Sequence, residues 1–303
     1  MKHFFKQNLT SNVAGFFMAT LFVLVITSCC KNCEPCNCDG KKPDYTKFFI
    51  AHAGGAIDGI VYTNCLEALD LSYSKGCKLF ELDLINTSDN KLVAAHGWVD
   101  FKTLVNYSGT IDNTPLTEKE FLSLKILGKY TPLNMGAINF WFRNHPDAIL
   151  VTDKINDPER IYKDFQFPDR VLMELFTWDA VDKAIELRIK PMPSENLIFG
   201  NSEKAIEMGI PPQLPLRDSN FEQILEEKKI EFIGTGLFLL RDNKDFFKHL
   251  KEKGYKTYAW LPIYKSLEEY VWIYEMIYCY GMYADNLDLL TFLLNKEATK
   301  YFL

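Results

Sequence analysis

The sequence predicts an α/β protein whose folded part is a (β/α)8 TIM barrel with an insertion after the second strand. The first observation is the repeated alternation of short apolar runs with amphipathic helical stretches, which favours a parallel sheet covered by helices. The second is length, because residues 47–303 come close to the roughly 250 residues typical of one such barrel. The third is that titratable side chains stand at or just after several apolar runs, where a barrel of this kind carries its chemistry.

Eight apolar runs are expected to form the barrel strands. They are Lys47–Ala51, Lys78–Leu84, Ile149–Asp153, Arg170–Phe176, Asn196–Phe199, Glu231–Gly234, Lys256–Leu261 and Met282–Asp285. Helices are expected over Trp178–Leu187, Glu203–Met208, Lys244–Lys253 and Leu267–Tyr280. An open, doubly wound sheet is the alternative, but no glycine-rich nucleotide-binding turn follows the first strand.

The interval between His96 and Ile149 is longer than one helix requires. It contains Thr117 followed three residues later by Glu120, which is a capping-box pattern, and then a second helical run through Phe140–Phe142. An insertion after the second strand lies at the C-terminal mouth of a barrel, so we expect it to shape access to the site.

The first 28 residues are expected to be an export signal rather than part of the fold. Residues 1–28 combine Lys2 and Lys6 with an apolar stretch and small residues before Cys29, a pattern typical of secretory signals. The Ile-Thr-Ser-Cys ending resembles a bacterial lipobox, in which Cys29 becomes the lipidated first residue. The alternative is a membrane-spanning anchor, but the apolar core is short for roughly 20 spanning residues. The sequence therefore predicts an exported lipoprotein, anchored to a membrane of the cell envelope on its periplasmic or surface face.

Residues 29–46 are expected to be a cysteine-rich tether between this anchor and the barrel at 47–303. Five of the eight cysteines lie between Cys29 and Cys38. Their spacing resembles part of an iron–sulfur run, but the fourth cysteine comes too early, and an exported chain favours disulfides or a plain tether. The other three, Cys65, Cys77 and Cys279, lie on apolar faces and are expected to be buried.

The charge balance argues against one class of partner. The formal net charge is −6, and the chain has no basic stripe or basic helix. Nucleic acid is therefore not an expected partner.

Glu81 and Asp83 form the centre of a predicted metal site. In an extended strand they point to one face, whereas Phe80, Leu82 and Leu84 point to the other. Because the helix-facing side of a barrel strand is apolar, both carboxylates should face the barrel interior. Two buried like charges are costly unless a cation joins them, and hard oxygen ligands suit Mg²⁺ or Ca²⁺. The alternative is a half-exposed strand with a solvated acidic face.

Two histidines flank this acidic pair in the sequence. His52 ends the first strand and precedes Gly54 and Gly55, which permit a tight turn, and His96 follows a short apolar segment. Because histidine titrates near 6.5, two of them beside an acidic pair are candidates for acid/base work, although each alone could be structural. His145 and His249 are expected at the surface.

These blocks resemble the pattern of the glycerophosphodiester phosphodiesterase family, one of the phosphatidylinositol-phosphodiesterase-like barrels. The matching segments are His52 with Gly54, Thr63–Ala68, Glu81–Asp83, Thr87–Asp89, His96, Thr131–Leu133, Val151–Lys154, Trp260 and Tyr283–Asp285. The similarity spans almost all of residues 47–303 and is most specific in its N-terminal third. It implies a (β/α)8 barrel, a divalent cation and hydrolysis of phosphodiesters that carry a glycerol-like alcohol.

The resemblance also implies a role for individual residues. The acid/base pair and the first two metal ligands would be His52, His96, Glu81 and Asp83. The family's third ligand is usually a glutamate two residues before a lysine. Here Asp153 directly precedes Lys154, so Asp153 is assigned to the metal and Lys154 to the phosphate. Trp260 is expected either to pack against the alcohol or to be a barrel-core aromatic.

The chain departs from the family pattern where the phosphate is bound. Ala53 stands where the family usually has an arginine, and Thr63 and Gly97 replace two acidic residues. A bidentate phosphate donor is therefore missing, which leaves Lys154 and the metal to neutralise charge.

The predicted function is a divalent-metal-dependent phosphodiester hydrolase that acts on a glycerol-phosphate, phospholipid-derived or related diester by His/His acid–base catalysis. Ala53 motivates an alternative, a non-catalytic surface lipoprotein that binds a phosphorylated glycan or lipid headgroup. A barrel amidohydrolase would need His-x-His on the first strand, where position 54 is glycine. A metal-free lipase of the phosphatidylinositol type would leave the Glu81–Asp83 pair unexplained.

Overall fold

The computed structural model describes residues 49–215, 220–260 and 278–285. The chain divides into two compact units, Met1–Asp44 and Tyr45–Leu303, and the second contains all the described residues. The predicted signal at 1–28, the predicted lipidation site Cys29, the tether at 29–46 and nearly all of the helix expected over Leu267–Tyr280 lie outside them. Within the described part, no helix has both the length and the apolar character needed to cross a membrane.

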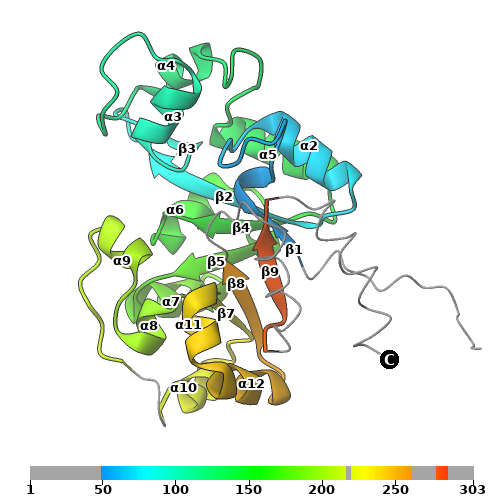
Figure 1. The fold of residues 1–303 in the computed structure, drawn as a ribbon, viewed down its shortest axis with the longest axis vertical. Helices are drawn as coiled ribbons and strands as arrows, with labels where there is room; N and C mark the ends of the chain where they lie inside the picture. Colours follow the sequence, from blue (N-terminus) through cyan, green and yellow to red (C-terminus); the bar gives the residue numbers. More distant parts are fainter. Residues whose placement is uncertain (1–48, 216–219, 261–277, 286–303) are drawn as a thin grey trace, which may run out of the picture. The chain divides into compact units, whose positions relative to one another are not determined.

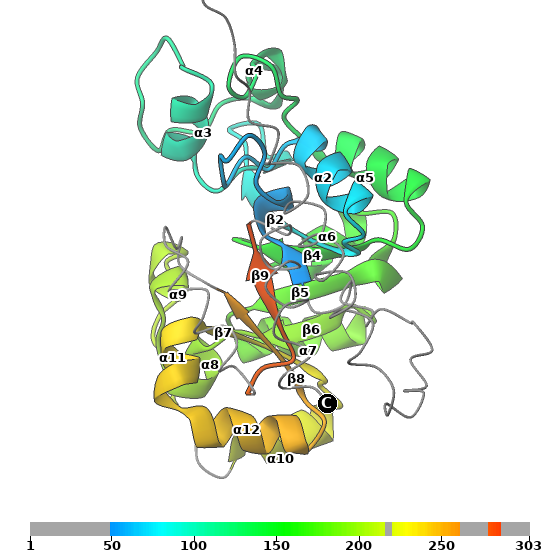
Figure 2. The same cartoon turned by 45° about the vertical axis from the view of Figure 1, so that its right-hand side comes forward.

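Eight parallel strands form a nearly closed barrel, which confirms the predicted fold class (Figure 1). They are β1 (Phe49–Ala51), β2 (Leu79–Asn86), β4 (Ile149–Asp153), β5 (Val171–Leu175), β6 (Lys190–Pro193), β7 (Phe232–Gly236), β8 (Lys256–Trp260) and β9 (Gly281–Ala284). Backbone hydrogen bonds join them in the order β6-β5-β4-β2-β1-β9-β8-β7, so β9 pairs with β1 as well as with β8 (Figure 2). Strands β6 and β7 are neighbours, but the described residues form no backbone ladder between them.

The barrel strands alternate between two environments with a period of two residues. Phe80, Leu82 and Leu84 of β2 belong to the large core between strands and helices. The opposite faces of the strands form a smaller apolar cluster inside the barrel, made of Ile50, Leu79, Val151, Leu172, Met192, Tyr258 and Tyr283. Two residues further along each of these segments comes a second set, namely His52, Glu81, Asp153, Glu174, Ser194, Trp260 and Asp285. Because alternate residues of a strand share a face, this second set forms a polar layer towards the C-terminal mouth.

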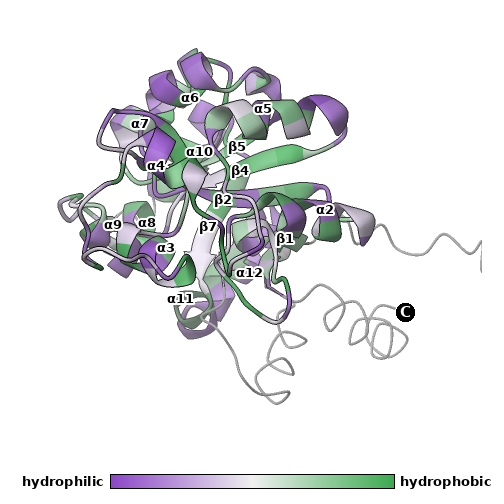
Figure 3. Cartoon of the chain, turned by 90° about the horizontal axis from the view of Figure 1, so that it is seen from above, coloured by the Kyte–Doolittle hydropathy of each residue, from purple (hydrophilic) through white to green (hydrophobic). Residues whose placement is uncertain are grey.

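Helices surround the strands on the outside (Figure 3). They are α2 (Leu66–Ser74), α5 (Met135–Asn144), α6 (Pro158–Asp164), α7 (Trp178–Glu186), α10 (Asn220–Lys228), α11 (Leu237–Asp242) and α12 (Lys244–Glu252). Local sequence sets several of their starts: the side chains of Asn134, Asp157 and Thr177 accept backbone hydrogen bonds at the beginning of α5, α6 and α7. Helices α7 and α12 begin where the sequence predicted them and end one residue earlier.

The predicted insertion follows β2. A short strand β3 (Leu92–Ala94) pairs antiparallel with β2, and α3 (Trp98–Leu104) and α4 (Glu118–Ser123) follow. The capping box of Thr117 and Glu120 is present at the start of α4. Phe101 and Phe121 stack with ring centroids 4.2 Å apart in a core cluster separate from the main one. The second expected helix is α5, which packs into the main core and therefore belongs to the ring of helices.

One predicted strand was wrong. Residues Asn196–Phe199 form a short helix, α8, and the fifth barrel strand is β6 instead. Strand β6 contains Pro191 and Pro193, which cannot donate backbone hydrogen bonds, so its strand signal is weak. This composition is tolerated because, among the described strands, β6 pairs on one side only, with β5. Gly200, at φ 93°, ends α8 in the left-handed conformation and donates its N–H to the carbonyl of Asn196.

Most of the smaller predictions about buried and exposed side chains agree with the structure. Cys65, Cys77 and Cys279 are buried, as expected. His249 is exposed, with 51% of its side chain accessible. His145 was expected at the surface but is half-buried, because its ring stacks on Trp141 with centroids 4.0 Å apart.

Candidate active site

Three buried carboxylates meet at the mouth of the barrel. Glu81 and Asp83 lie on β2 and Asp153 lies at the end of β4, and none of the three is more than 4% exposed. The parallel register pairs Asp83 with Asp153, which brings both to one level of the barrel. Oxygen atoms of the three side chains all lie within 4.8 Å of one another. The structure thus brings together the three residues predicted as metal ligands.

Two turns hold the carboxylates of β2 in place. The backbone N–H of Ala53 donates to Glu81 Oε2 at 2.6 Å. Asn64 donates from Nδ2 to Asp83 Oδ2 at 2.9 Å and accepts from the Asp83 N–H at 3.1 Å. Ala53 and Asn64 both have φ 48°, a left-handed conformation that is uncommon outside glycine. Such backbone strain concentrates at functional sites.

The donor set fits a divalent cation. Glu81 Oε1 is buried and has no hydrogen-bond partner among the residues that the structure describes. Burial, together with the charges of Asp83 and Asp153, raises the pKa of Glu81 well above its ordinary value. A cation would supply the missing partner of Glu81 Oε1 and offset the repulsion among the three acids. Because all the donors are carboxylate oxygens, the set suits Mg²⁺ or Ca²⁺.

The two predicted acid/base histidines both contact one aromatic ring, that of Tyr62. His52 Nδ1 lies 3.0 Å from Asp285 Oδ1, and His96 Nδ1 lies 2.7 Å from Asp100 Oδ2. The ring centroid of Tyr62 lies 4.7 Å from that of His52 and 4.5 Å from that of His96. A carboxylate on Nδ1 orients an imidazole and leaves Nε2 available for proton transfer.

A buried lysine that sequence reasoning missed joins the acidic cluster. Lys204 Nζ lies 2.8 Å from Asp153 Oδ2 and 3.0 Å from Glu174 Oε2. Lys204 comes from α9 (Glu203–Glu207), and Glu174 lies on β5. Burial alone would raise the pKa of Asp153, but Lys204 outweighs it and holds this pKa below the ordinary value. Asp153 is therefore already partly neutralised, whereas Glu81 is not.

Glu195 and Trp260 lie on the side of the mouth formed by β7 and β8. Glu195 accepts a hydrogen bond from the Gly236 N–H, and burial raises the pKa of Glu195 to about 7. A Cβ at Gly236 would lie 2.8 Å from the Trp260 ring and 3.0 Å from the Glu195 carboxylate, so only glycine fits there. Trp260 is half-buried, and the Lys204 ammonium lies 5.2 Å from its ring centroid.

Lys154, which was predicted to bind the phosphate, forms its ion pair with a carboxylate outside the cluster of three. Its Nζ lies 2.6 Å from Glu207 Oε2 of α9. Its backbone, at φ 60°, turns the chain so that the Lys154 N–H donates to Asp153 Oδ1 at 2.7 Å. The backbone of Lys154 therefore supports the cluster, while its ammonium helps to hold α9.

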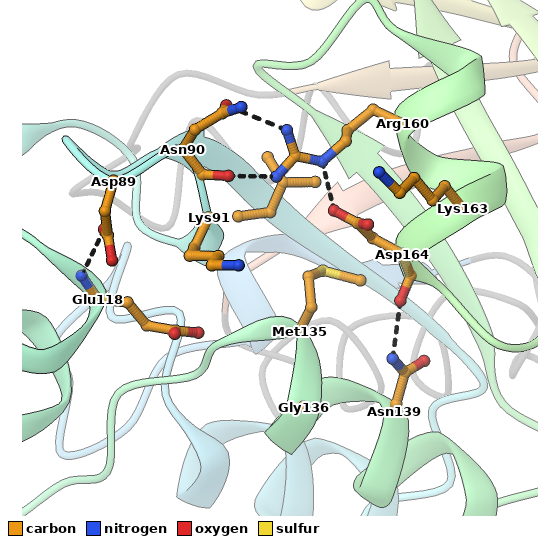
Figure 4. Close-up of a pocket in the computed structure, with 11 residues that line it drawn as sticks. Asp89, Asn90, Lys91, Glu118, Met135, Gly136, Asn139, Arg160, Lys163 and Asp164 are labelled. Atoms are coloured by element: carbon orange, nitrogen blue, oxygen red, sulfur yellow. Dashed lines mark hydrogen bonds and ion pairs between the residues drawn. The ribbon is translucent and has the colours of Figure 1, made fainter.

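A separate pocket of about 540 Å³ lies between the β2–β3 turn, α5 and α6 (Figure 4). In this pocket the guanidinium of Arg160 donates hydrogen bonds to Asn90 and to the carboxylate of Asp164. None of the residues that line this pocket is a candidate site residue.

Among the comparisons with known proteins, the one with solved structures identifies the fold. No protein-family model matches the chain, and no curated protein sequence matches it significantly. Among solved structures, a protein from Galdieria sulphuraria assigned as a glycerophosphodiester phosphodiesterase has 18% identity and a TM-score of 0.61, over 82% of this chain and 97% of that chain. A glycerophosphodiester phosphodiesterase from Parabacteroides distasonis has 17% identity and a TM-score of 0.58, with the same coverage. An Oleispira antarctica phosphodiesterase in complex with the product sn-glycerol-3-phosphate has 15% identity and a TM-score of 0.55, over 83% and 99%. At such identities the likeness establishes a shared barrel fold.

Proposed function

We propose that this protein is a divalent-metal-dependent phosphodiester hydrolase that acts on a glycerophosphodiester or a related phospholipid-derived diester. The observation that carries the proposal is the buried, unpartnered Glu81 Oε1 within a three-carboxylate cluster. Two carboxylate-bound histidines lie beside this cluster, and both contact the ring of Tyr62. The barrel is shared with a glycerophosphodiester phosphodiesterase and with a phosphodiesterase in complex with the product sn-glycerol-3-phosphate, which supports a diester of that alcohol.

Different residues would bind the cation and transfer the protons. Glu81, Asp83 and Asp153 would hold the cation, which when bound polarises phosphoryl oxygens and offsets developing charge. Of His52 and His96, one would deprotonate the attacking water or a neighbouring substrate hydroxyl, and the other would protonate the leaving alcohol, each through Nε2.

The remaining predicted contacts concern the phosphate and the alcohol. Trp260 offers an apolar ring at the mouth for the alcohol. Lys154 can serve the phosphate once its ion pair with Glu207 opens.

Turnover by the purified full chain tests this proposal. We expect hydrolysis of at least one glycerophosphodiester with Mg²⁺, Ca²⁺ or Mn²⁺ and loss of activity in EDTA. His52→Ala and His96→Ala should each lower kcat by about 10²- to 10⁴-fold, since this is the usual contribution of a general acid or base. His249→Ala, at an exposed histidine paired with Glu222, is the matched control and should leave the rate unchanged.

Two outcomes would reject the hydrolase. One is no turnover of any diester in a broad panel with all three ions. The other is calorimetric binding of a diester without turnover, which would favour the non-catalytic binding protein suggested by Ala53.

We also propose that Cys29 is lipidated after removal of residues 1–28, so that the barrel is held at a membrane near lipid-derived substrates. The lipobox-like ending before Cys29 supports this. Cys29→Ser should move the protein from the membrane fraction to the soluble fraction of cells that express it. An unchanged distribution would reject lipid anchoring at this cysteine.

A further inference from the structure

We infer that Tyr62 is a substrate-binding residue whose hydroxyl donates a hydrogen bond to the phosphoryl group in place of the cation that Ala53 cannot supply. The inference rests on the proposed hydrolase function and specifies how its phosphate is bound. It also predicts which charge state of phosphate the site prefers.

The ring of Tyr62 contacts both candidate acid/base histidines. Its ring meets His52 edge-on, at an interplanar angle of 75°, and His96 at a tilt of 48°. Any phosphoryl group that reaches both imidazoles must therefore pass close to the Tyr62 side chain. No other aromatic ring in the described part of the chain contacts both histidines.

The backbone of Tyr62 is held in a conformation that a bulky residue rarely adopts. Its φ is 58°, in the left-handed region. Two residues further on, Asn64 is tied to the turn after β1, because its N–H donates to the Ala53 carbonyl at 3.1 Å. The strained turn that carries Tyr62 is thus joined to the residue that replaces the arginine. Strain of this kind persists where the surrounding structure enforces it, and it is common in ligand-binding sites.

The hydroxyl of Tyr62 is suited to donate to an anion. It has no hydrogen-bond partner within the described residues, and its side chain is only half-buried, so a ligand can reach it. Burial, together with the nearby charges of Asp285, Asp83 and Glu81, raises the pKa of this phenol. The group therefore remains a protonated, neutral donor at neutral pH.

Exchanging an arginine for a tyrosine changes the charge that the site offers. An arginine brings a positive charge and two parallel hydrogen bonds, whereas Tyr62 brings one hydrogen bond and no charge. The lost attraction is larger for a dianion than for a monoanion, because Coulomb energy scales with ligand charge. Compared with a site that carries an arginine, this site should therefore lose more affinity for a dianionic phosphomonoester than for a monoanionic phosphodiester, and inorganic phosphate should be a weak inhibitor.

Two substitutions separate the hydroxyl of Tyr62 from its ring. Tyr62→Phe should lower kcat/KM about tenfold, mainly through KM, since one hydrogen bond to a charged group is lost. Tyr62→Leu should lower kcat as well, because the histidines lose the ring that contacts both of them. Tyr73→Phe is the matched control: its hydroxyl binds Asp147 at 2.8 Å, outside the site, so the kinetics should not change.

Several results would overturn the inference. An active enzyme with unchanged kcat/KM in Tyr62→Phe would show that the hydroxyl does not bind substrate, whether or not Tyr62→Leu is impaired. Inhibition by inorganic phosphate as strong as substrate binding would refute the predicted charge preference. Thermal unfolding of each variant checks that the fold is retained.

Failure of the proposed hydrolase function can be distinguished from failure of the inference about Tyr62. If the wild-type protein turns over no diester, calorimetry with a glycerophosphodiester and Mg²⁺ still decides the role of Tyr62. Weaker binding to Tyr62→Phe than to wild type would support the inference, and equal binding, or none to either protein, would reject it.

Discussion

A single buried carboxyl, Glu195, gives the stability of this protein a pH dependence. Glu195 is 3% exposed and accepts a hydrogen bond from the Gly236 N–H. Burial and then the charge of Glu174 raise the pKa of Glu195 to about 7, from an ordinary value of 4.5. Because the pKa is raised on folding, ionisation of Glu195 costs stability. This cost is absent below about pH 4.5, grows as the pH rises through 7 and is constant above that.

Glu195→Gln should therefore stabilise the protein at alkaline pH. Glutamine keeps the acceptor for Gly236 but carries no charge, so the gain in unfolding free energy at pH 8 should be on the order of 3 kcal/mol, since one pKa unit is about 1.4 kcal/mol. Most of the gain should disappear at pH 5. Urea unfolding at the two pH values measures this, and Glu227→Gln on exposed α10 is the control. Equal gains at both pH values would contradict the account.

Sequence reasoning placed some site residues and missed others for identifiable reasons. Glu81 and Asp83 were expected to face the interior because they alternate with Phe80 and Leu82, and both are indeed buried there. Glu174 follows Leu172 with the same two-residue period, so the signal that would have found it was present.

For Lys204 and Tyr62 the sequence contained no periodic pattern that would have predicted a place in the site. Lys204 belongs to a short helix whose sequence is Glu-Lys-Ala-Ile-Glu, a composition typical of an exposed turn of helix. Its burial depends on where α9 lies against strands that are far away in the sequence. Tyr62 stands in a loop, and only the fold brings its ring into contact with both His52 and His96.

Among the secondary-structure elements, β6 and α8 are the ones that the local sequence pattern did not predict correctly. The other barrel strands overlap their expected ranges because apolar and β-branched residues mark them, as in Ile149–Asp153. In β6 the prolines weaken this strand signal. In α8 the apolar run Leu197, Ile198 and Phe199 has the composition of a buried strand but forms a helical turn. The choice between the two depends on pairing with β5, a contact that the local sequence does not reveal.

Two lysine–carboxylate attachments join helix α9 to the barrel mouth, and they should contribute unequally to the stability of its position. Lys204 reaches two buried carboxylates, and its own side chain is 14% exposed. The Glu207 partner of Lys154 is 61% exposed, so water screens that pair. The position of α9 should therefore depend mainly on Lys204.

Lys204→Met should destabilise the metal-free protein by about 3–5 kcal/mol, because it leaves Asp153 and Glu174 buried without a cation. Adding Mg²⁺ or Ca²⁺ should restore part of the loss, since a bound cation can neutralise Asp153. Urea unfolding in EDTA and with each ion measures both effects. Lys183→Met, at an exposed pair with Glu186, is the control and should change little. A small effect of Lys204→Met in EDTA would show that α9 is held by other contacts.

The barrel as a whole concentrates negative charge at one end. Five buried carboxyl groups line its mouth, on Glu81, Asp83, Asp153, Glu174 and Glu195. Within the described residues, Lys204 is the one lysine whose ammonium forms an ion pair with any of them. The mouth also contains the junction of β6 and β7, the one pair of neighbouring barrel strands without a backbone ladder in the described part of the chain. Repulsion among Glu81, Asp83 and Asp153 therefore destabilises this end of the barrel, and a bound cation would relieve it.

Divalent cations should therefore raise the thermal stability of the whole molecule. A ligand that binds only the folded state stabilises it by about 2.7 kcal/mol at a hundredfold excess over Kd, so Tm should rise by several degrees when Mg²⁺ or Ca²⁺ replaces EDTA. Glu81→Gln and Asp83→Asn should remove most of this response, because each takes a ligand from the cluster. Asp169→Asn, at an exposed acid, should retain it, and KCl at equal ionic strength controls for screening. If Glu81→Gln responds as strongly as wild type, the cations bind exposed acids elsewhere, and the cluster at the barrel mouth is not the metal site.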